Sequence, residues 1–133
     1  MSWDIFTQDI PPEAGCVDEI PADFVPAELG SRDDLIDRIR RVAPSVDFSD
    51  PAWGNLETPE LSVEFNMGHS RTLTSFALHL RGGDLATGFV SDLLEHLGLR
   101  ALDPQSVGGI LAPGVAAAEN VLKWRTYRDS LLG

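Results

Sequence analysis

Two runs of alternating apolar and polar residues, followed by a helical pattern, constrain the fold of this 133-residue chain more than any other feature. In residues 61–67 and 72–81, apolar side chains recur at nearly every second position, as in strands with one buried face. Over residues 85–97 they recur every three or four positions, which is typical of an amphipathic helix. The Gly-Gly-Asp of residues 82–84 supplies the turn and the helix N-cap. We therefore predict an α+β fold: a mainly antiparallel sheet with a central β-hairpin, covered by about three helices.

The register of this hairpin follows from the pattern only in part. Because side chains alternate between the two faces, the apolar faces stay together only if paired residue numbers add up to an odd number. A four-residue loop then pairs Met67 with Thr72, and a six-residue loop pairs Met67 with Thr74. The shorter loop is favoured by loop statistics, although it turns Leu73 towards the polar face.

The rest of the chain is expected to complete a single α+β domain over residues 1–133. Residues 3–8 have the β-branched and aromatic composition of a strand. Ser31 starts a helix as its N-cap, with Asp34 at the third helical position, and Pro44 ends that helix. Short strands are expected near residues 53–56 and 99–102, a glycine-rich loop over residues 105–114 and a last helix over residues 115–131.

Charge is distributed unevenly along the sequence. The net charge is -11, and residues 1–31 contain seven Asp or Glu and no Lys or Arg. Four prolines lie between residues 9 and 30, and we expect this acidic segment to lie on the body of the domain. The negative electrostatic potential of this segment disfavours binding to nucleic acids and anionic membranes and attracts a basic protein partner. The alternative is that the acidity serves only to keep the protein in solution.

Cysteine and histidine usage argues against disulfides, metals and familiar catalytic motifs. The lone Cys16 excludes an intramolecular disulfide and a cysteine-clustered zinc site. His69, His79 and His96 lack the spacing of metal ligands, so no metal, cofactor or catalytic residue is assigned. The first twenty residues have no basic and apolar leader pattern, and a cytoplasmic location is expected.

The junction between the second run and the helix is one candidate binding site. Glycines at a helix N-terminus expose N–H groups that attract anions. The pattern does not continue as a phosphate-binding loop, and a carboxylate occupies the place of the anion. The alternative is a tight turn with a helix cap. The candidate residues are Arg81, Gly82, Gly83 and Asp84.

The polar face of the hairpin is the second candidate. It presents Glu64, His79 and Arg81, an acid, an imidazole and a guanidinium on one surface, together with Ser62, Asn66 and Ser75. A Glu/His pair performs general acid–base chemistry if a pocket forms around it, whereas a solvated sheet face is decorated in the same way. The hairpin register with a four-residue loop places Glu60 opposite His79, and the register with a six-residue loop places it opposite Arg81.

Three segments, MSWDIF-x-QDIP, DFSDPAWG and LHLRGGD, resemble a group of small acidic bacterial proteins of unassigned function. The resemblance implies a bacterial cytoplasmic origin and assigns no catalytic or ligand residue. The acidic start and the missing catalytic motifs favour a non-catalytic protein-binding or regulatory module, of the kind that inhibits a basic toxin. The alternative is a small enzyme or small-molecule-binding protein that uses the hairpin's polar face and the Arg-Gly-Gly-Asp turn. A deep pocket would favour the alternative, and an exposed apolar patch would favour the binder.

Overall fold

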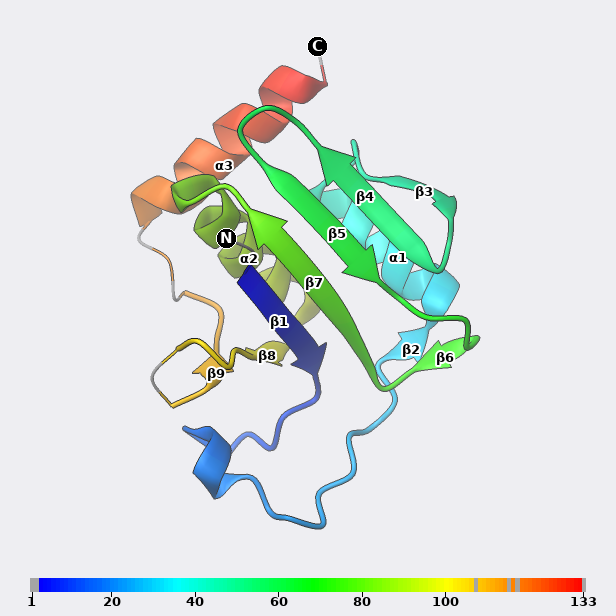
Figure 1. Cartoon of the computed structure of the whole chain (residues 1–133), viewed down its shortest axis with the longest axis vertical. Coiled ribbons are helices and arrows are strands. Elements are labelled where there is room, and N and C mark those ends of the chain that lie inside the picture. Colours follow the sequence, from blue (N-terminus) through cyan, green and yellow to red (C-terminus); the bar gives the residue numbers. More distant parts are fainter. Residues whose placement is uncertain (1–2, 107, 115, 117, 133) are drawn as a thin grey trace.

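A computed structural model describes residues 3–106, 108–114, 116 and 118–132 and shows an α+β fold (Figure 1). The longer strands are β1 (Trp3–Gln8), β3 (Asp47–Asp50), β4 (Trp53–Glu57), β5 (Ser62–Asn66), β7 (Ser75–Arg81) and β8 (Arg100–Leu102). The two-residue strands are β2 (Gly30–Ser31), β6 (Thr72–Leu73) and β9 (Ile110–Leu111). The helices are α1 (Arg32–Val42), α2 (Asp84–Leu97) and α3 (Ala118–Leu131), with a 3-10 turn, η1, at Val17–Glu19.

Seven strands form one antiparallel sheet in the order β3-β4-β5-β7-β1-β8-β9, which confirms the predicted fold class. The two alternating runs of the sequence become β5 and β7, which pair in the interior of this sheet. β1 lies between β7 and β8, so the first described strand is an interior strand. β9 falls within the segment that was expected to be only a loop.

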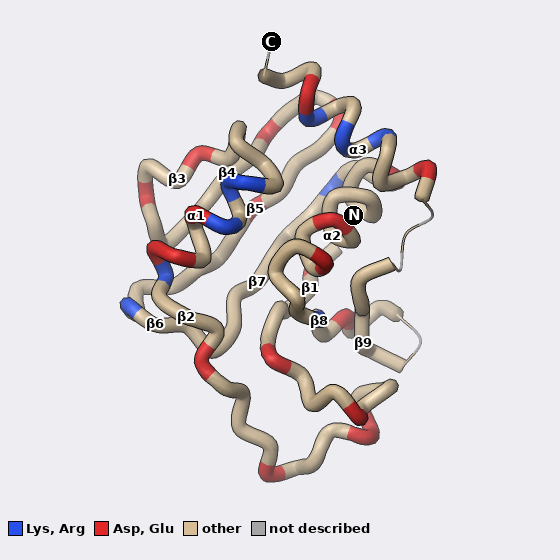
Figure 2. The backbone as a smooth tube through the Cα atoms, turned by 180° about the vertical axis from the view of Figure 1, so that it is seen from behind, with Lys and Arg blue, Asp and Glu red and all other residues tan. Residues whose placement is uncertain are grey.

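Helices α1 and α2 lie against one face of the sheet, and α3 packs against α2 (Figures 1 and 2). The opposite face points away from α1 and α2. None of the helices in the described part of the chain has the length and apolar character of a membrane-spanning segment.

The helix ends follow local sequence signals at Ser31 and Gly98 but not at Asp84. The Ser31 hydroxyl oxygen accepts a hydrogen bond from the Asp34 N–H at 3.0 Å, as the capping pattern predicts. Gly98 adopts a left-handed conformation, and the Leu99 N–H donates to the Leu94 carbonyl, which ends α2. The prediction that Asp84 is the N-cap of α2 is wrong. Gly82 and Gly83 both have positive φ, which completes the turn early and places Asp84 inside the helix.

The hairpin register differs from both expected pairings. Phe65 lies opposite Leu78 and Glu64 opposite His79, so the parity of the pairing is confirmed and both loop lengths are wrong. The reason is Leu73. Residues 72–73 leave the hairpin as β6 and pair with β2, and this buries Leu73 instead of turning it to the polar face.

The expected position of Glu60 is therefore also wrong. Glu60 lies in the turn before β5, and its carbonyl oxygen approaches Gly82 rather than His79 or Arg81. A side chain at position 82 would meet this carbonyl and Leu61, which explains why a glycine with φ of +153° stands there.

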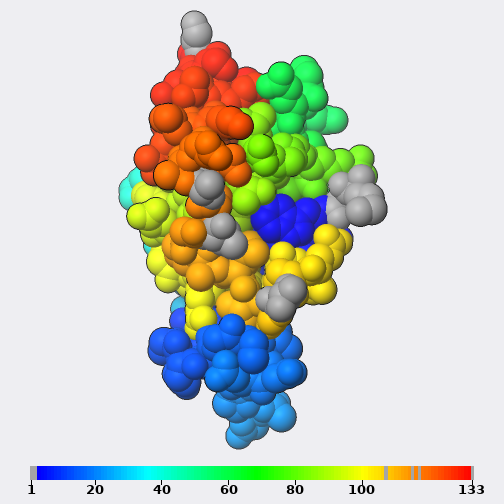
Figure 3. Space-filling model, turned by 90° about the vertical axis from the view of Figure 1, so that its left-hand side faces the viewer, coloured from blue at the N-terminus to red at the C-terminus, as the bar shows by residue number. Residues whose placement is uncertain are grey.

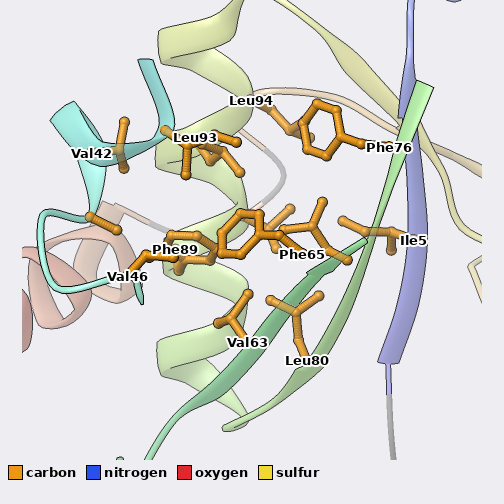
Figure 4. Close-up of a cluster of buried hydrophobic side chains, with 14 of the residues drawn as sticks. Ile5, Val42, Val46, Val63, Phe65, Phe76, Leu80, Phe89, Leu93 and Leu94 are labelled. Carbon is orange, nitrogen blue, oxygen red and sulfur yellow. The ribbon is translucent and has the colours of Figure 1, made fainter. Parts of the chain in front are cut away.

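The main core lies between the sheet and α2 (Figure 4). Phe89 of α2 has its ring edge-on to Phe65 of β5, with centroids 6.0 Å apart, and edge-on to Trp124 of α3, 4.8 Å away. These three side chains are fully buried. This helix therefore packs on β5 and β7, because Phe76, Leu78, Leu93 and Leu97 belong to the same cluster.

A buried carboxylate joins α3 to α2. Asp92 of α2 accepts hydrogen bonds from the Trp124 indole N–H at 3.1 Å and from Arg125 Nη2 at 2.7 Å. The hydrogen bond to Asp92 raises the pKa of Arg125, since it stabilises the charged guanidinium. The backbones of the two helices also come close, because a methyl group at Gly88 would overlap the backbone carbonyl of Asn120.

The acidic segment packs on the body at its start and projects at its far end. Ile10 and Ala14 are buried, and Arg100 of β8 donates hydrogen bonds to the carbonyls of Ala14 (2.6 Å), Ile10 and Pro11. The following residues form a lobe at one end of the molecule (Figure 3). Val25, which belongs to this segment, is 80% exposed.

Replacing Phe89 with Ala should lower the free energy of unfolding by about 3–5 kcal/mol, because it removes the ring that fills the space between the sheet and α3. Denaturant titration of both proteins measures the change. The control is Leu122→Ala at a side chain that is 66% exposed on α3, which should change stability by no more than about 0.5 kcal/mol. A loss below about 1 kcal/mol for Phe89→Ala would contradict the packing.

Gly88→Ala should destabilise the protein by about 1–3 kcal/mol, because the new methyl group forces α2 and α3 apart. Helix propensity alone predicts the opposite sign, a gain of about 1 kcal/mol. The sign of the change in unfolding free energy therefore decides between the two. Glu95→Ala, at an exposed position of the same helix, is the matched control and should be nearly neutral.

Candidate functional site

The face of the sheet that points away from α1 and α2 carries ordered rows of side chains, because residues paired across strands lie on the same face. One row is charged and crosses four strands: Asn55 of β4, Glu64 of β5, His79 of β7 and Asp4 of β1. The next row towards the top of Figure 1 consists of Glu57, Ser62 and Arg81. The row on the other side consists of Trp53, Asn66, Ala77, Phe6 and Leu102.

A hollow of about 470 Å³ lies on this face. Its lining includes Ser62, where β5 begins, and Arg81, where β7 ends. Its lining comes from four different strands and consists of Asp4, Trp53, Glu57, Ser62, Glu64, His79 and Arg81. The surface is therefore dished rather than flat, and its walls are mostly polar.

His79 is held in place from two sides. Its Nδ1 lies 2.8 Å from Oδ1 of Asp4, and its ring stacks against the indole of Trp53, with centroids 6.1 Å apart and planes 23° apart. Since Trp53 is on β4 and His79 on β7, the indole reaches across β5 to make this contact. Because an ionised carboxylate only accepts hydrogen bonds, Nδ1 is the donor in this contact, and in the neutral form of the ring Nε2 is the acceptor nitrogen.

The hollow has an excess of negative charge. Asp4, Glu57 and Glu64 are its carboxylates, and Arg81 is its guanidinium. In the part of the chain that the structure describes, the side chains of Glu57 and Glu64 form no hydrogen bond within 3.5 Å and no ion pair within 4.0 Å. Glu64 is nevertheless half-buried among its neighbours.

The structure brings together three of the six predicted binding residues. Glu64, His79 and Arg81 line the hollow, whereas Gly82, Gly83 and Asp84 do not. The Asp84 carboxylate lies 3.8 Å from the Lys123 ammonium of α3, and both groups are well exposed, so the pair adds little stability. A role of the Arg-Gly-Gly-Asp turn in anion binding stays a prediction.

Asp4, Trp53 and Glu57 are the lining residues that the sequence prediction missed. They come from β4 and β1, which flank the hairpin on either side. The alternation of Trp53, Asn55 and Glu57 with the buried Gly54 and Leu56 is the signal that could have placed two of them on the same face.

A second, apolar depression of about 650 Å³ lies along α3. Its apolar and aromatic lining residues are Leu85, Leu122 and Tyr127, and the remaining lining residues are Glu60, Glu119, Lys123, Thr126 and Ser130. It shares no residue with the hollow on the sheet, and its exposed Leu122 makes it a useful reference surface for experiments.

The site and fold define an α+β protein with an antiparallel sheet that is covered by helices on one face and dished on the other. Within residues 3–106, 108–114, 116 and 118–132, no group of three His, Cys, Asp or Glu side chains is arranged to hold a metal ion. Comparisons with family models, with curated proteins and with solved structures gave no match. The arrangement of the site is thus the basis for any functional proposal.

The neutral form of His79 should carry its proton on Nδ1, since Asp4 accepts a hydrogen bond from that nitrogen. Long-range ¹H–¹⁵N spectra of the imidazole rings report the tautomer directly. Asp4→Ala should abolish the preference of the neutral His79 ring for the tautomer that is protonated on Nδ1. His69 and His96 are exposed and serve as internal references in the same spectra. Protonation of His79 on Nε2 in the wild-type protein would contradict the Asp4–His79 geometry.

Proposed function

We propose that this protein is a non-catalytic protein-binding module that docks its partner on the dished face of the sheet. The observation that carries the proposal is a pair of exposed aromatic side chains on that face: Trp53 is 41% exposed and Phe6 is 40% exposed. Aromatic side chains are enriched in protein interfaces, where they act as anchors that lose most of their contact with water.

The rows of the sheet support this use of the face. Ala77 and Asn66 lie between Phe6 and Trp53, so small and medium side chains separate two large ones. Leu102 continues the apolar surface beyond Phe6 onto β8. A partner that covers this row would bury aromatic and aliphatic surface at its centre and meet the charged row at its rim, as in stable interfaces.

Charge indicates the kind of partner. The net charge of -11 and the carboxylates of the hollow favour a basic protein over an acidic one or a nucleic acid. A bacterial cytoplasmic setting is part of this proposal and depends on the resemblance of three sequence segments.

The test compares the partner affinity of variants on the dished face with that of variants at exposed apolar positions elsewhere. Tagged wild-type protein is used to capture partners from a bacterial lysate at low and high salt, and the partner found is purified and titrated against each variant. Phe6→Asp and Trp53→Asp should weaken its binding by about 30-fold or more, since each removes an aromatic anchor and introduces a charge. Leu122→Asp and Val25→Asp, at exposed apolar positions outside the face, should leave binding within about twofold.

Circular dichroism and thermal unfolding show whether each variant is folded before its binding is judged. If Leu122→Asp abolishes binding while Phe6→Asp does not, the partner docks on α3 and the proposal is wrong. A captured protein that binds all four variants equally would also contradict docking on the sheet.

A small enzyme is the second candidate, and one observation favours it. Asp4 orients His79 through Nδ1, which leaves Nε2 as a potential general base in the hollow, next to Glu64 and Arg81. The hollow is broad and open to solvent, however, which weakens electrostatic catalysis. His79→Gln separates the two candidates: it would abolish turnover of any substrate, but should reduce partner binding only to the extent that the ring contributes contact area.

A further inference from the structure

We propose that the hollow is a socket for one arginine side chain of the protein partner. This inference rests on the proposed function, because it names the partner's anchoring group at the same face. It concerns the charged end of the face together with Trp53, and Phe6 does not line the hollow.

The first argument is the position of the Trp53 indole. The ring leaves β4 and crosses β5 to stack beside His79, so it forms a wall of the hollow instead of standing away from the sheet. Because it is 41% exposed, part of the ring surface is available to a ligand. Tryptophan is the aromatic residue that binds cations best, and guanidinium groups stack on its face.

The second argument is the spacing of the two unpartnered carboxylates. Glu57 lies opposite Ser62, two residues before Glu64 on the neighbouring strand. Such diagonal neighbours are about 7–8 Å apart. A planar guanidinium between them can donate to a carboxylate on each side, which a single ammonium point charge does less well.

The third argument is the balance of charge around the hollow. Three carboxylates of the hollow, those of Asp4, Glu57 and Glu64, face one guanidinium, that of Arg81. Asp4 has the imidazole as a partner, so Glu57 and Glu64 carry the charge that a ligand would neutralise. The excess disfavours phosphate or carboxylate ligands, and the half-buried position of Glu64 strengthens its attraction for a cation compared with bulk water.

The fourth argument is the shape of the hollow. Its volume of about 470 Å³ falls within the range of small-ligand sites, but it is open and has polar walls. A free amine would be only partly enclosed there. A side chain delivered by a protein that also covers the aromatic row would have its exposed side closed by that protein.

The inference is tested on the full chain with three capped tripeptides, acetyl-Gly-Xaa-Gly-amide, in which Xaa is arginine, lysine or citrulline. Citrulline has nearly the shape of arginine without its charge. The readout is the indole N–H signal of Trp53 in ¹H–¹⁵N spectra. The indole N–H groups of Trp3 and Trp124 donate to Asp103 and Asp92 and serve as internal references.

The arginine peptide should shift the Trp53 signal with a dissociation constant in the millimolar range, roughly that of one anchored side chain. The lysine peptide should bind several-fold more weakly, and the citrulline peptide should give no saturable shift. The double variant Glu57→Gln/Glu64→Gln should weaken arginine binding by about tenfold or more.

The matched control is Asp18→Asn/Asp23→Asn, which removes the same amount of charge from exposed positions of the acidic segment. It should leave arginine binding within about twofold at physiological salt, because exposed charges farther apart than about 8 Å are screened there. Both double variants replace carboxylates with amides of the same shape, so the fold is retained, and the reference indole signals confirm this.

Three results would overturn the socket: saturable binding of citrulline equal to that of arginine, shifts confined to α3, or an equal loss of affinity in both double variants. The proposed function is judged separately by the effect of Phe6→Asp on partner binding. If that effect is seen and the arginine peptide fails, the face is a docking surface with a different anchor. If neither is seen, both proposals fail.

Discussion

The burial of one face of the sheet under α2 is the constraint on which the rest of the structure depends. Phe89 lies between Phe65 of the sheet and Trp124 of α3, so one aromatic ring connects three layers of the protein. Because the apolar side chains of β5 and β7 turn towards this helix, the alternating polar ones must turn the other way. The dished face is the direct consequence of the core on its opposite side.

Local signals in the sequence were sufficient for the elements and for the fold class. The change of period after Arg81, the Ser31 cap and the Gly98 stop each depend on residues within one turn of the chain. The register of the hairpin was not predictable in this way. It is set by Leu73, which finds its burial by pairing β6 with β2, a strand about forty residues earlier in the chain.

The residues of the candidate site also divide into those that local sequence signals reveal and those that depend on long-range strand pairing. Glu64, His79 and Arg81 were found because they alternate along one hairpin, whereas Asp4 and Trp53 come from strands whose neighbours the sequence does not specify. Asp92 was missed for a different reason. It lies beside the apolar stripe of α2, and only the approach of Trp124 and Arg125 from α3 explains a buried carboxylate there.

The interior position of β1 has a consequence for the order of assembly during synthesis. β1 precedes both of its neighbours in the chain, and these neighbours, β7 and β8, end at residues 81 and 102. A nascent chain that stops short of β8 leaves one edge of β1 unpaired, and before β7 emerges Asp4 has no imidazole to hold. The hollow therefore forms only after β7, which carries His79 and Arg81, has left the ribosome, and shorter nascent chains lack the surface that we propose for recognition.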